Sequence, residues 1–236
     1  MTLSSTASAD ASISERFAAV RASIETAAHA VGRDPASVTL VAVSKTQEPV
    51  AIDAALATGQ RIFGENRVQE AQGRWTPRLG DLPGLQLRLI GPLQTNKAAD
   101  AVALFDVIET LDRPKLARAL AEAIQRTGRD PSVLIQVNTG AEPQKAGVLM
   151  ADLSGLLTLA RNVLGLRVEG LMAIPPVDEP AAPHFQRLRR LAADEGLSVL
   201  SMGMSSDYAA AIAEGATHVR VGSALFGERK AWQGPL

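Results

Sequence analysis

The amino-acid sequence predicts a single (β/α)8 barrel of the TIM type with an extra helix before its first strand. Short runs of β-branched and other apolar residues alternate with longer amphipathic runs, which indicates βαβ units and a parallel sheet. About eight such units fit into 236 residues, as in a closed barrel. A doubly wound open sheet is the alternative, but no G-x-G-x-x-G follows the first apolar run.

The first expected element is a helix. In "SISE", Ser12 and Glu15 have the spacing of a capping box. The apolar residues that follow at helical spacing are Phe17, Val20, Ile24, Ala27 and Val31. Gly32 ends this run. Residues 1–11 are rich in Ser, Thr and Ala, and we expect them to be disordered, so that one domain spans residues 12–236.

Eight strands are then expected, each rich in β-branched or other apolar residues. They cover 37–45, 61–66, 85–93, 105–112, 132–140, 166–174, 197–203 and 217–223. Amphipathic segments between them, for instance 48–59, 113–128 and 183–196, end in glycine as helices often do. The sequence "GRDP" precedes both the first and the fifth strand. We interpret it as a repeated device that ends a helix rather than as a surviving half-barrel repeat.

Composition excludes several classes of protein. Basic and acidic residues number 24 and 25 and are interspersed, for a net charge of −1, so no footprint for nucleic acid or an anionic membrane surface is present. The chain has no cysteine, which excludes disulfides and thiolate chemistry. It starts without a secretory signal pattern and has no apolar run of membrane-spanning length. We expect a cytoplasmic protein.

In such barrels the ligand binds at the carboxyl ends of the strands, and the first strand ends in a lysine. The chain has five lysines, and Lys45 follows the apolar run "VTLVAVS". Val41, Val43 and Lys45 share one strand face. If that face lines the barrel, partial burial or a nearby cation lowers the pKa of the amine and makes it a nucleophile for a carbonyl. The alternative is a rim lysine that extends into water, and position alone does not separate the two.

The end of the eighth strand favours the first interpretation. In "HVRVGS", Arg220 lies near the strand end, and Gly222 and Ser223 open the next turn. Small residues there leave backbone N–H groups accessible to a phosphate, and the seventh strand also ends in glycine and hydroxyls, "SMGMSS". Because the eighth strand of a closed barrel lies beside the first, these groups should lie near Lys45. They predict a site for a phosphorylated carbonyl compound held as an imine.

These segments resemble the pyridoxal-phosphate homeostasis protein family, single-domain relatives of the alanine racemase barrel. The matching segments are "VAVSKTQ", "FGENRVQE", "IGPLQTNK", "VNTGAEPQKAG", "GLMAI" and "SMGMSSDYAAAIAEGATHVRVGSALFG". The resemblance implies an alanine-racemase N-terminal-domain-like barrel. It also implies bound pyridoxal 5′-phosphate and a role in vitamin B6 and amino-acid homeostasis. Two departures affect loop details: Pro92 replaces a histidine common in the family, and "NTGAEPQKAG" lacks the usual serine and further acidic residues.

The resemblance also assigns roles to individual residues. It makes Lys45 the residue that forms the covalent aldimine, or Schiff base, and Arg220 the arginine that faces the pyridine nitrogen. Asn66 lies beside the cofactor ring. The phosphate cup then comprises Ser205, Gly222 and Ser223, with Ser201 and Met204 as further members.

These residues predict a cofactor carrier with no catalytic residue. Arginine at the ring nitrogen makes the ring a poor electron sink, and racemisation needs a second acid/base opposite the lysine. Tyr208, the single tyrosine, is expected to pack at a helix start, and Asp207 to cap that helix. The three histidines, His29, His184 and His218, share no metal-ligand spacing and are expected to be structural.

Other functions stay open at this point. The chain could act as a weak pyridoxal-phosphate-dependent amino-acid racemase, or as a Schiff-base aldolase with Glu65 as its acid/base. It could also be an interaction protein for which the cofactor is a signal. The partners expected of a carrier are the cofactor itself, amino acids, and apo-enzymes that need it.

Overall fold

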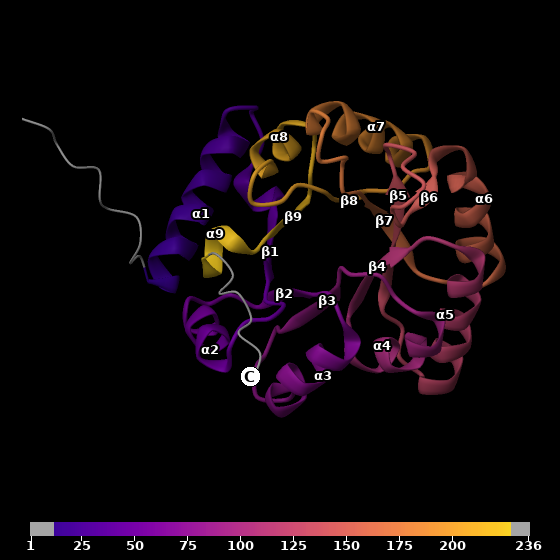
Figure 1. The fold of residues 1–236 in the computed structure, drawn as a ribbon, viewed down its shortest axis with the longest axis horizontal. Helices are drawn as coiled ribbons and strands as arrows, with labels where there is room; N and C mark the ends of the chain where they lie inside the picture. Colours follow the sequence, from indigo (N-terminus) through magenta and orange to yellow (C-terminus); the bar gives the residue numbers. More distant parts are fainter. Residues whose placement is uncertain (1–11, 228–236) are drawn as a thin grey trace, which may run out of the picture.

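The structure, a computed structural model, describes residues 12–227. Within these residues eight parallel strands close into a barrel (Figure 1) in the order β4-β3-β2-β1-β9-β8-β7-β5, and β5 pairs with β4. The strands are β1 Thr39–Val43, β2 Ile62–Glu65, β3 Gln86–Leu89, β4 Val107–Leu111, β5 Ser132–Asn138, β7 Val168–Met172, β8 Val199–Ser201 and β9 His218–Val221. The predicted fold class is confirmed. The disorder expected of residues 1–11 lies outside the described residues.

The structure contains one short strand that was not predicted, and the other strands are shorter than the predicted ranges. β6, Val148–Leu149, pairs with the end of β5 outside the ring, and the sequence pattern did not predict it. The first strand ends at Val43 rather than at residue 45. Lys45 therefore lies two residues beyond the strand, in the loop at its carboxyl end.

Helices surround the barrel (Figure 1). They are α1 Ile13–His29, α2 Pro49–Ala57, α3 Val68–Trp75, α4 Ala98–Leu104, α5 Pro114–Thr127, α6 Leu153–Leu157, α7 Ala181–Asp194, α8 Tyr208–Ala213 and α9 Ser223–Phe226. A π-helical segment, Thr158–Val163, continues α6, and 3-10 turns cover Pro35–Ser37, Thr76–Arg78, Thr95–Lys97 and Met150–Asp152. Gly32 and Gly128 follow α1 and α5 with φ of 68° and 70°. The left-handed backbone at both supports the interpretation of "GRDP" as a helix-ending device.

The extra helix α1 begins where it was predicted to begin, but it ends before the predicted end at Gly32. Ser12 Oγ accepts from Glu15 N–H at 3.2 Å while the Glu15 carboxylate accepts from Ser12 N–H at 2.7 Å, which is the complete capping box. The helix ends at His29. Val31 was expected to continue the apolar stripe but is 44% exposed, because the chain has already turned away from the barrel.

The same helix completes the outer layer. α9, which follows the last barrel strand, has four residues, too few to cover β9 and β1. α1 packs against α2, α8 and α9 and lies outside the β9–β1 side of the barrel (Figure 1). The Phe17 and Phe226 rings meet edge to face at 5.9 Å. The first helix of the chain thus occupies the place of the eighth barrel helix.

Side chains of each strand alternate between the helical layer and the barrel interior. On β1, Leu40 and Ala42 pack into the core between strands and helices, so Val41 and Val43 point inward. On β4, Val107 joins a small inner cluster with Leu134 and Met172. This alternation decides which residues after each strand face the interior.

Candidate functional site

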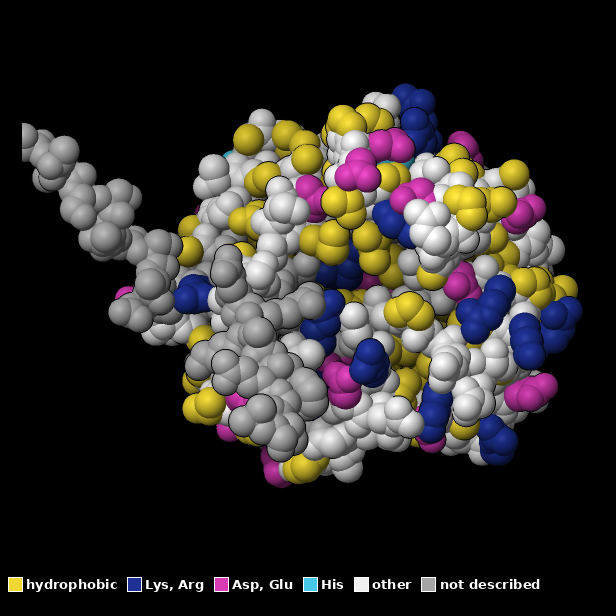
Figure 2. Space-filling view, viewed as in Figure 1, with side chains coloured by type: hydrophobic (Ala, Val, Ile, Leu, Met, Phe, Trp, Pro, Cys, Tyr) yellow, Lys and Arg dark blue, Asp and Glu magenta, His cyan; other side chains and the backbone are white. Residues whose placement is uncertain are grey.

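A cavity of about 330 Å³ opens at the carboxyl ends of β1, β8 and β9, a size typical of the smaller ligand sites. It is lined by Val43, Lys45, Thr46, Gln47, Ile90, Met204, Ser205, Ser206, Arg220, Gly222, Ser223 and Gly227. The side chains of Lys and Arg gather around a central hollow over the barrel (Figure 2). The ionisable residues among the lining are Lys45 and Arg220.

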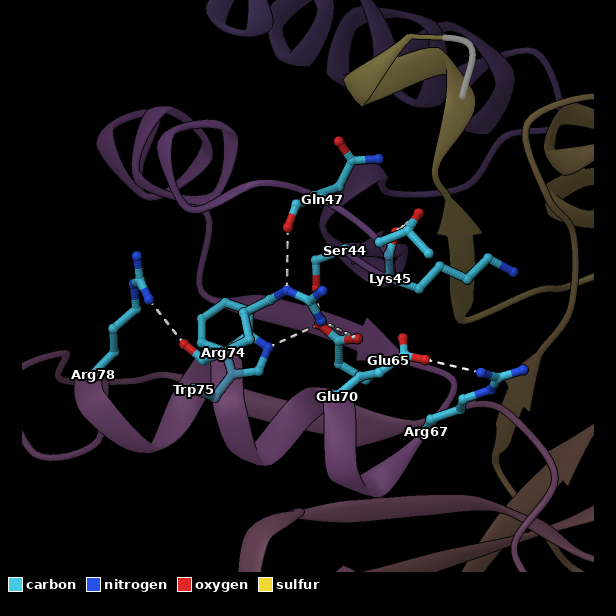
Figure 3. A network of polar contacts seen from close by, with 10 residues as sticks. Ser44, Lys45, Gln47, Glu65, Arg67, Glu70, Arg74, Trp75 and Arg78 are labelled. Carbon is cyan, nitrogen blue, oxygen red and sulfur yellow. Dashed lines mark hydrogen bonds and ion pairs between the residues drawn. The ribbon is translucent and has the colours of Figure 1, made fainter. Parts of the chain in front are cut away.

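Lys45 and Ser44 are neighbours whose side chains lie on opposite sides of the barrel wall. Lys45 continues the inward face of Val43 and lines the cavity. Ser44 is buried on the outer side, where its Oγ donates to Glu65 Oε1 at 2.6 Å. Figure 3 shows the lysine side chain directed away from this outer network. Lys45 thus lies on the cavity side of the wall, where the alternation of the first predicted strand placed it, although the strand itself ends at Val43.

Arg220 reaches the cavity from the inward face of β9. Its side chain is fixed by two hydrogen bonds, from Nη1 to Ser201 Oγ at 2.8 Å and from Nη2 to the Ala173 carbonyl at 2.9 Å. Burial lowers the pKa of this guanidinium, while the negative charges of Glu109 and Asp207 oppose the shift. The result is a rigid cation at the bottom of the cavity.

A buried ionic network, which was not predicted from the sequence, lies beneath the cavity. Arg88 Nε donates to Glu109 Oε1 at 2.5 Å, and Ser201 Oγ donates to Glu109 Oε2 at 2.5 Å. Burial raises the pKa of Glu109, but the charges of Arg88 and Arg220 and the hydrogen bonds from Ser201 and Arg88 outweigh it, so the net shift is downward. The signal was available: Arg88 and Glu109 are charged residues within strands of a sheet that helices cover.

His218, on the inward face of β9, belongs to the same interior. Burial, together with the positive charges of Arg88 and Arg220, lowers its pKa to about 4 although Glu109 opposes the shift. The imidazole is therefore neutral at pH 7. Its Nδ1 lies 2.9 Å from Thr217 Oγ1.

Two backbone N–H groups at the end of β9 converge on one oxygen. Gly222 N–H donates to Ser205 Oγ at 3.3 Å, and Ala224 N–H donates to the same oxygen at 3.5 Å. Ser223 lines the cavity beside them. Two donors directed at one oxygen can also bind a phosphate oxygen, and Ser205, whose oxygen accepts from both, lines the same cavity as Lys45 and Arg220.

The structure therefore brings six of the predicted residues to one cavity, and two lie elsewhere. Those on the cavity are Lys45, Met204, Ser205, Arg220, Gly222 and Ser223. Ser201 is fully buried beneath Arg220. Asn66 lies against Gly91, where an added Cβ would meet the Asn66 carbonyl oxygen at 2.3 Å. Thr46, Gln47 and Ile90, which line the cavity, were not singled out. Thr46 and Gln47 directly follow the first predicted strand, and Ile90 lies within the third.

Glu65, the acid/base of the aldolase alternative, does not line the cavity. Its side chain lies on the outer face of β2, where Ser44, Arg74 and Trp75 all donate to Oε1, at 2.6, 3.0 and 2.9 Å. Arg74 also donates to Oε2 at 2.9 Å. A carboxylate with these partners and no exposure is not placed to exchange a proton with a ligand.

The other side chains considered for chemistry have structural contacts. The Tyr208 hydroxyl donates to Ser23 Oγ on α1 at 2.9 Å, away from the cavity. Asp207 precedes α8, as expected, but its Oδ1 accepts from Met204 N–H at 2.6 Å and bonds no N–H of the helix. Among the described residues no group of His, Cys, Asp and Glu is arranged to hold a metal ion.

Comparison with known proteins gives the family. The model of the family "Alanine racemase, N-terminal domain" matches residues 16–230. The chain is 48% identical over 223 residues to the pyridoxal phosphate homeostasis protein of Pseudomonas aeruginosa, covering 92% of this chain and 96% of that one. It is 42% identical to the protein of that name from Escherichia coli, covering 92% and 97%. The chain belongs to the pyridoxal phosphate homeostasis protein family.

Solved structures of this family include PipY of Synechococcus elongatus. Its form without PLP superposes with a TM-score of 0.82 at 42% identity, covering 92% of this chain and 100% of that chain. Its form with PLP bound gives a TM-score of 0.80 at 41% identity with the same coverage. An alanine racemase of Clostridium difficile shares the fold alone, at 13% identity and a TM-score of 0.67, and the chain covers 57% of it. Within residues 12–227 no helix has the length and apolar character needed to cross a membrane.

Proposed function

We propose that this chain binds pyridoxal 5′-phosphate in the cavity at the ends of β1, β8 and β9, holds it covalently through Lys45, and serves vitamin B6 and amino-acid homeostasis in the cytoplasm as a carrier without turnover. The observation that carries the proposal is that one amine, one guanidinium and Ser205, whose oxygen accepts from two backbone N–H groups, all line a single cavity. The family name of its relatives and the PLP-bound form of PipY support it.

The chemistry of the donors fits this ligand. Lys45 Nζ forms the carbon–nitrogen double bond with the aldehyde carbon, and the carbonyl oxygen leaves as water. Gly222, Ala224 and the Ser205 and Ser223 hydroxyls bind the phosphate, and Arg220 donates to the pyridine nitrogen. Met204 contacts the ring from the side, while Ser201 acts through Arg220; Asn66, which does not line the cavity, is given no contact with the ligand. Pyridoxal phosphate supplies a reactive aldehyde on an aromatic ring that can draw electrons from a bound amine.

The buried charges favour an anionic ligand. Arg88 and Arg220 are 3% and 4% exposed, and Glu109, the carboxylate between them, is 0% exposed. The network beneath the cavity thus carries two positive charges and one negative charge. An uncompensated buried charge is unfavourable, and a phosphorylated ligand at the adjacent cavity reduces that penalty.

The lining explains why we propose no turnover. Proton transfer at a bound amino acid needs an acid/base on the face opposite the lysine. Within residues 12–227, the ionisable residue that lines the cavity besides Lys45 is Arg220, whose guanidinium is held by Ser201 and Ala173. The residues present can therefore capture and release an amine-reactive aldehyde. The cofactor is handed on when the nitrogen of an incoming amino acid, or of a lysine in an apo-enzyme, replaces Lys45 Nζ on the aldehyde carbon.

The test is the absorption spectrum of the purified protein with pyridoxal phosphate, followed by borohydride reduction and peptide mapping. We expect a visible absorption band and a reduced adduct on Lys45. Lys45→Ala should abolish the adduct, whereas Lys97→Ala, which removes a lysine paired with Asp100 outside the cavity, should not. A missing band, or undiminished trapping in Lys45→Ala, would overturn the proposal. Deuterium uptake at the α-carbon of added amino acids in heavy water would favour a racemase over a carrier.

A further inference from the structure

The turn that carries Lys45 has an unusual backbone. Gln47 N–H donates to the Ser44 carbonyl at 3.1 Å, which closes a four-residue turn with Lys45 and Thr46 at its centre. Thr46 has φ of 62°. A β-branched residue is disfavoured in this left-handed region by about 1–2 kcal/mol. Such a conformation persists only where surrounding contacts hold it.

These contacts lie on the outer face of the barrel wall (Figure 3). At the start of the turn, Ser44 Oγ donates to Glu65 Oε1 at 2.6 Å. At its end, Arg74 Nε donates to the Gln47 carbonyl at 3.3 Å. Glu65 and Arg74 are themselves joined by two hydrogen bonds of 3.0 and 2.9 Å. One ion pair thus binds both the first and the last residue of the turn.

The ion pair is suited to fix a backbone because it is buried and well coordinated. The Glu65 side chain is 0% exposed and that of Arg74 is 13% exposed. Trp75 Nε1 also donates to Glu65, and its ring packs on Phe63 with centroids 4.7 Å apart. Charge-assisted bonds in such surroundings have little freedom to rearrange.

We propose that Glu65 and Arg74 are positioning residues that hold the turn Ser44–Gln47 in the conformation that directs Lys45 into the cavity. They act from the opposite side of the barrel wall, through the backbone, and do not touch the ligand. What Lys45 does in the cavity rests on the proposed function, whereas the conformation of the turn does not.

The test uses Glu65→Gln, with Glu70→Gln as the matched control. Glu70 pairs with Arg67 at 3.1 Å on the exposed side of α3 and does not contact the turn. Two quantities are measured: hydrogen exchange of the Gln47 amide without ligand, and the rate at which borohydride-trapped pyridoxal phosphate accumulates on Lys45. In Glu65→Gln we expect exchange to be faster and trapping slower, each by about tenfold, with no change in Glu70→Gln.

A rescue variant separates positioning from general destabilisation. Glycine adopts positive φ at no steric penalty, so the turn of Thr46→Gly needs less support from the ion pair. We expect Glu65→Gln to slow trapping much less in a Thr46→Gly background than in the natural sequence. The melting temperature of the double variant should stay low, because the buried network is still broken. If Glu65 only stabilised the fold, the double variant would keep both the slow trapping and the low melting temperature of Glu65→Gln.

Unchanged exchange at Gln47 in Glu65→Gln, unchanged trapping despite faster exchange, or an equal loss in the Thr46→Gly background would overturn the proposal. If Glu65→Gln does not fold, Arg74→Lys decides the matter, since lysine lacks the Nε that donates to Gln47. If the unsubstituted chain gives no adduct, the proposed function fails, and the role of the ion pair is decided by amide exchange alone.

Discussion

Glu109 and Arg220 share the hydroxyl group of Ser201. Its oxygen accepts from Arg220 Nη1 at 2.8 Å and its proton is donated to Glu109 Oε2 at 2.5 Å. The cation of the cavity is thereby connected to a carboxylate in the barrel interior, and the behaviour of the site depends on residues that the ligand does not touch.

Ser201→Ala should weaken the binding of pyridoxal phosphate without removing any group from the cavity lining. The change leaves Arg220 Nη1 and Glu109 Oε2 each short of one buried partner, which is unfavourable by about 1–3 kcal/mol. We expect both a lower free energy of unfolding and a higher Kd, measured by urea unfolding and by fluorescence titration. Ser154→Ala, at an exposed hydroxyl of α6, is the control; equal Kd values for the two variants would contradict the positioning of Arg220 by Ser201.

Glu109→Gln should be among the most destabilising single changes in the barrel. Arg88 and Arg220 would remain buried without a carboxylate, and breaking a buried ion pair in this way lowers the free energy of unfolding by about 3–5 kcal/mol. Urea unfolding at pH 7 measures the effect. Arg88→Met combined with Glu109→Leu should recover part of the stability, because the charge of Arg88 is removed together with that of Glu109 while Arg220 still lacks the carboxylate. A Glu109→Gln variant as stable as the natural protein would show that the carboxylate is not ionised.

His218 should make the protein less stable in mild acid. The folded-state pKa of about 4 lies below the value of about 6.5 for an unfolded chain, so the unfolded state binds a proton first as the pH falls. Stability is therefore full above about pH 6.5 and is lost progressively down to pH 4, by up to about 3 kcal/mol. Unfolding free energies between pH 7 and pH 4.5 should fall less in His218→Gln than in His29→Gln, which changes an exposed histidine of α1. Equal slopes would contradict the prediction.

Two glycines should respond in opposite ways to alanine. At Gly170 on β7 an added Cβ would lie 2.0 Å from the Val199 carbonyl oxygen of β8, so these paired strands must separate. At Gly155 in α6 nothing lies within 4 Å, and alanine raises helix propensity by about 1 kcal/mol. Thermal unfolding should show a lowered melting temperature for Gly170→Ala and an unchanged or raised one for Gly155→Ala. A tolerated Gly170→Ala would mean that β7 and β8 are not paired in this register.

The barrel could be predicted from the sequence because apolar strand-like runs and amphipathic helical segments alternate regularly along the chain. Eight apolar runs between amphipathic segments require parallel strands, and the inward face of Val41 and Val43 correctly directed Lys45 to the cavity. The interior network could not be derived with the same certainty. That Arg88 meets Glu109, and Ser201 meets Arg220, depends on strand register, which the pattern of single strands does not specify. Glu65, which the aldolase alternative would need as its acid/base, lies on the outer side of the wall, and the alternation of side chains along its own expected strand, 61–66, was the signal for that.

The helix α1 has a consequence for how this protein is made. Two of its three helical partners, α8 and α9, are the last described helices of the chain, whereas α1 precedes every barrel strand. Much of its apolar face is therefore covered only after the last barrel strand has been made. We expect nascent and truncated chains to expose Phe17 and its neighbours, and to depend on chaperones until synthesis ends. A circular permutant that begins at β1 and carries α1 after α9 would restore the usual strand-then-helix order of synthesis, and would shorten the time for which the apolar face of α1 is uncovered.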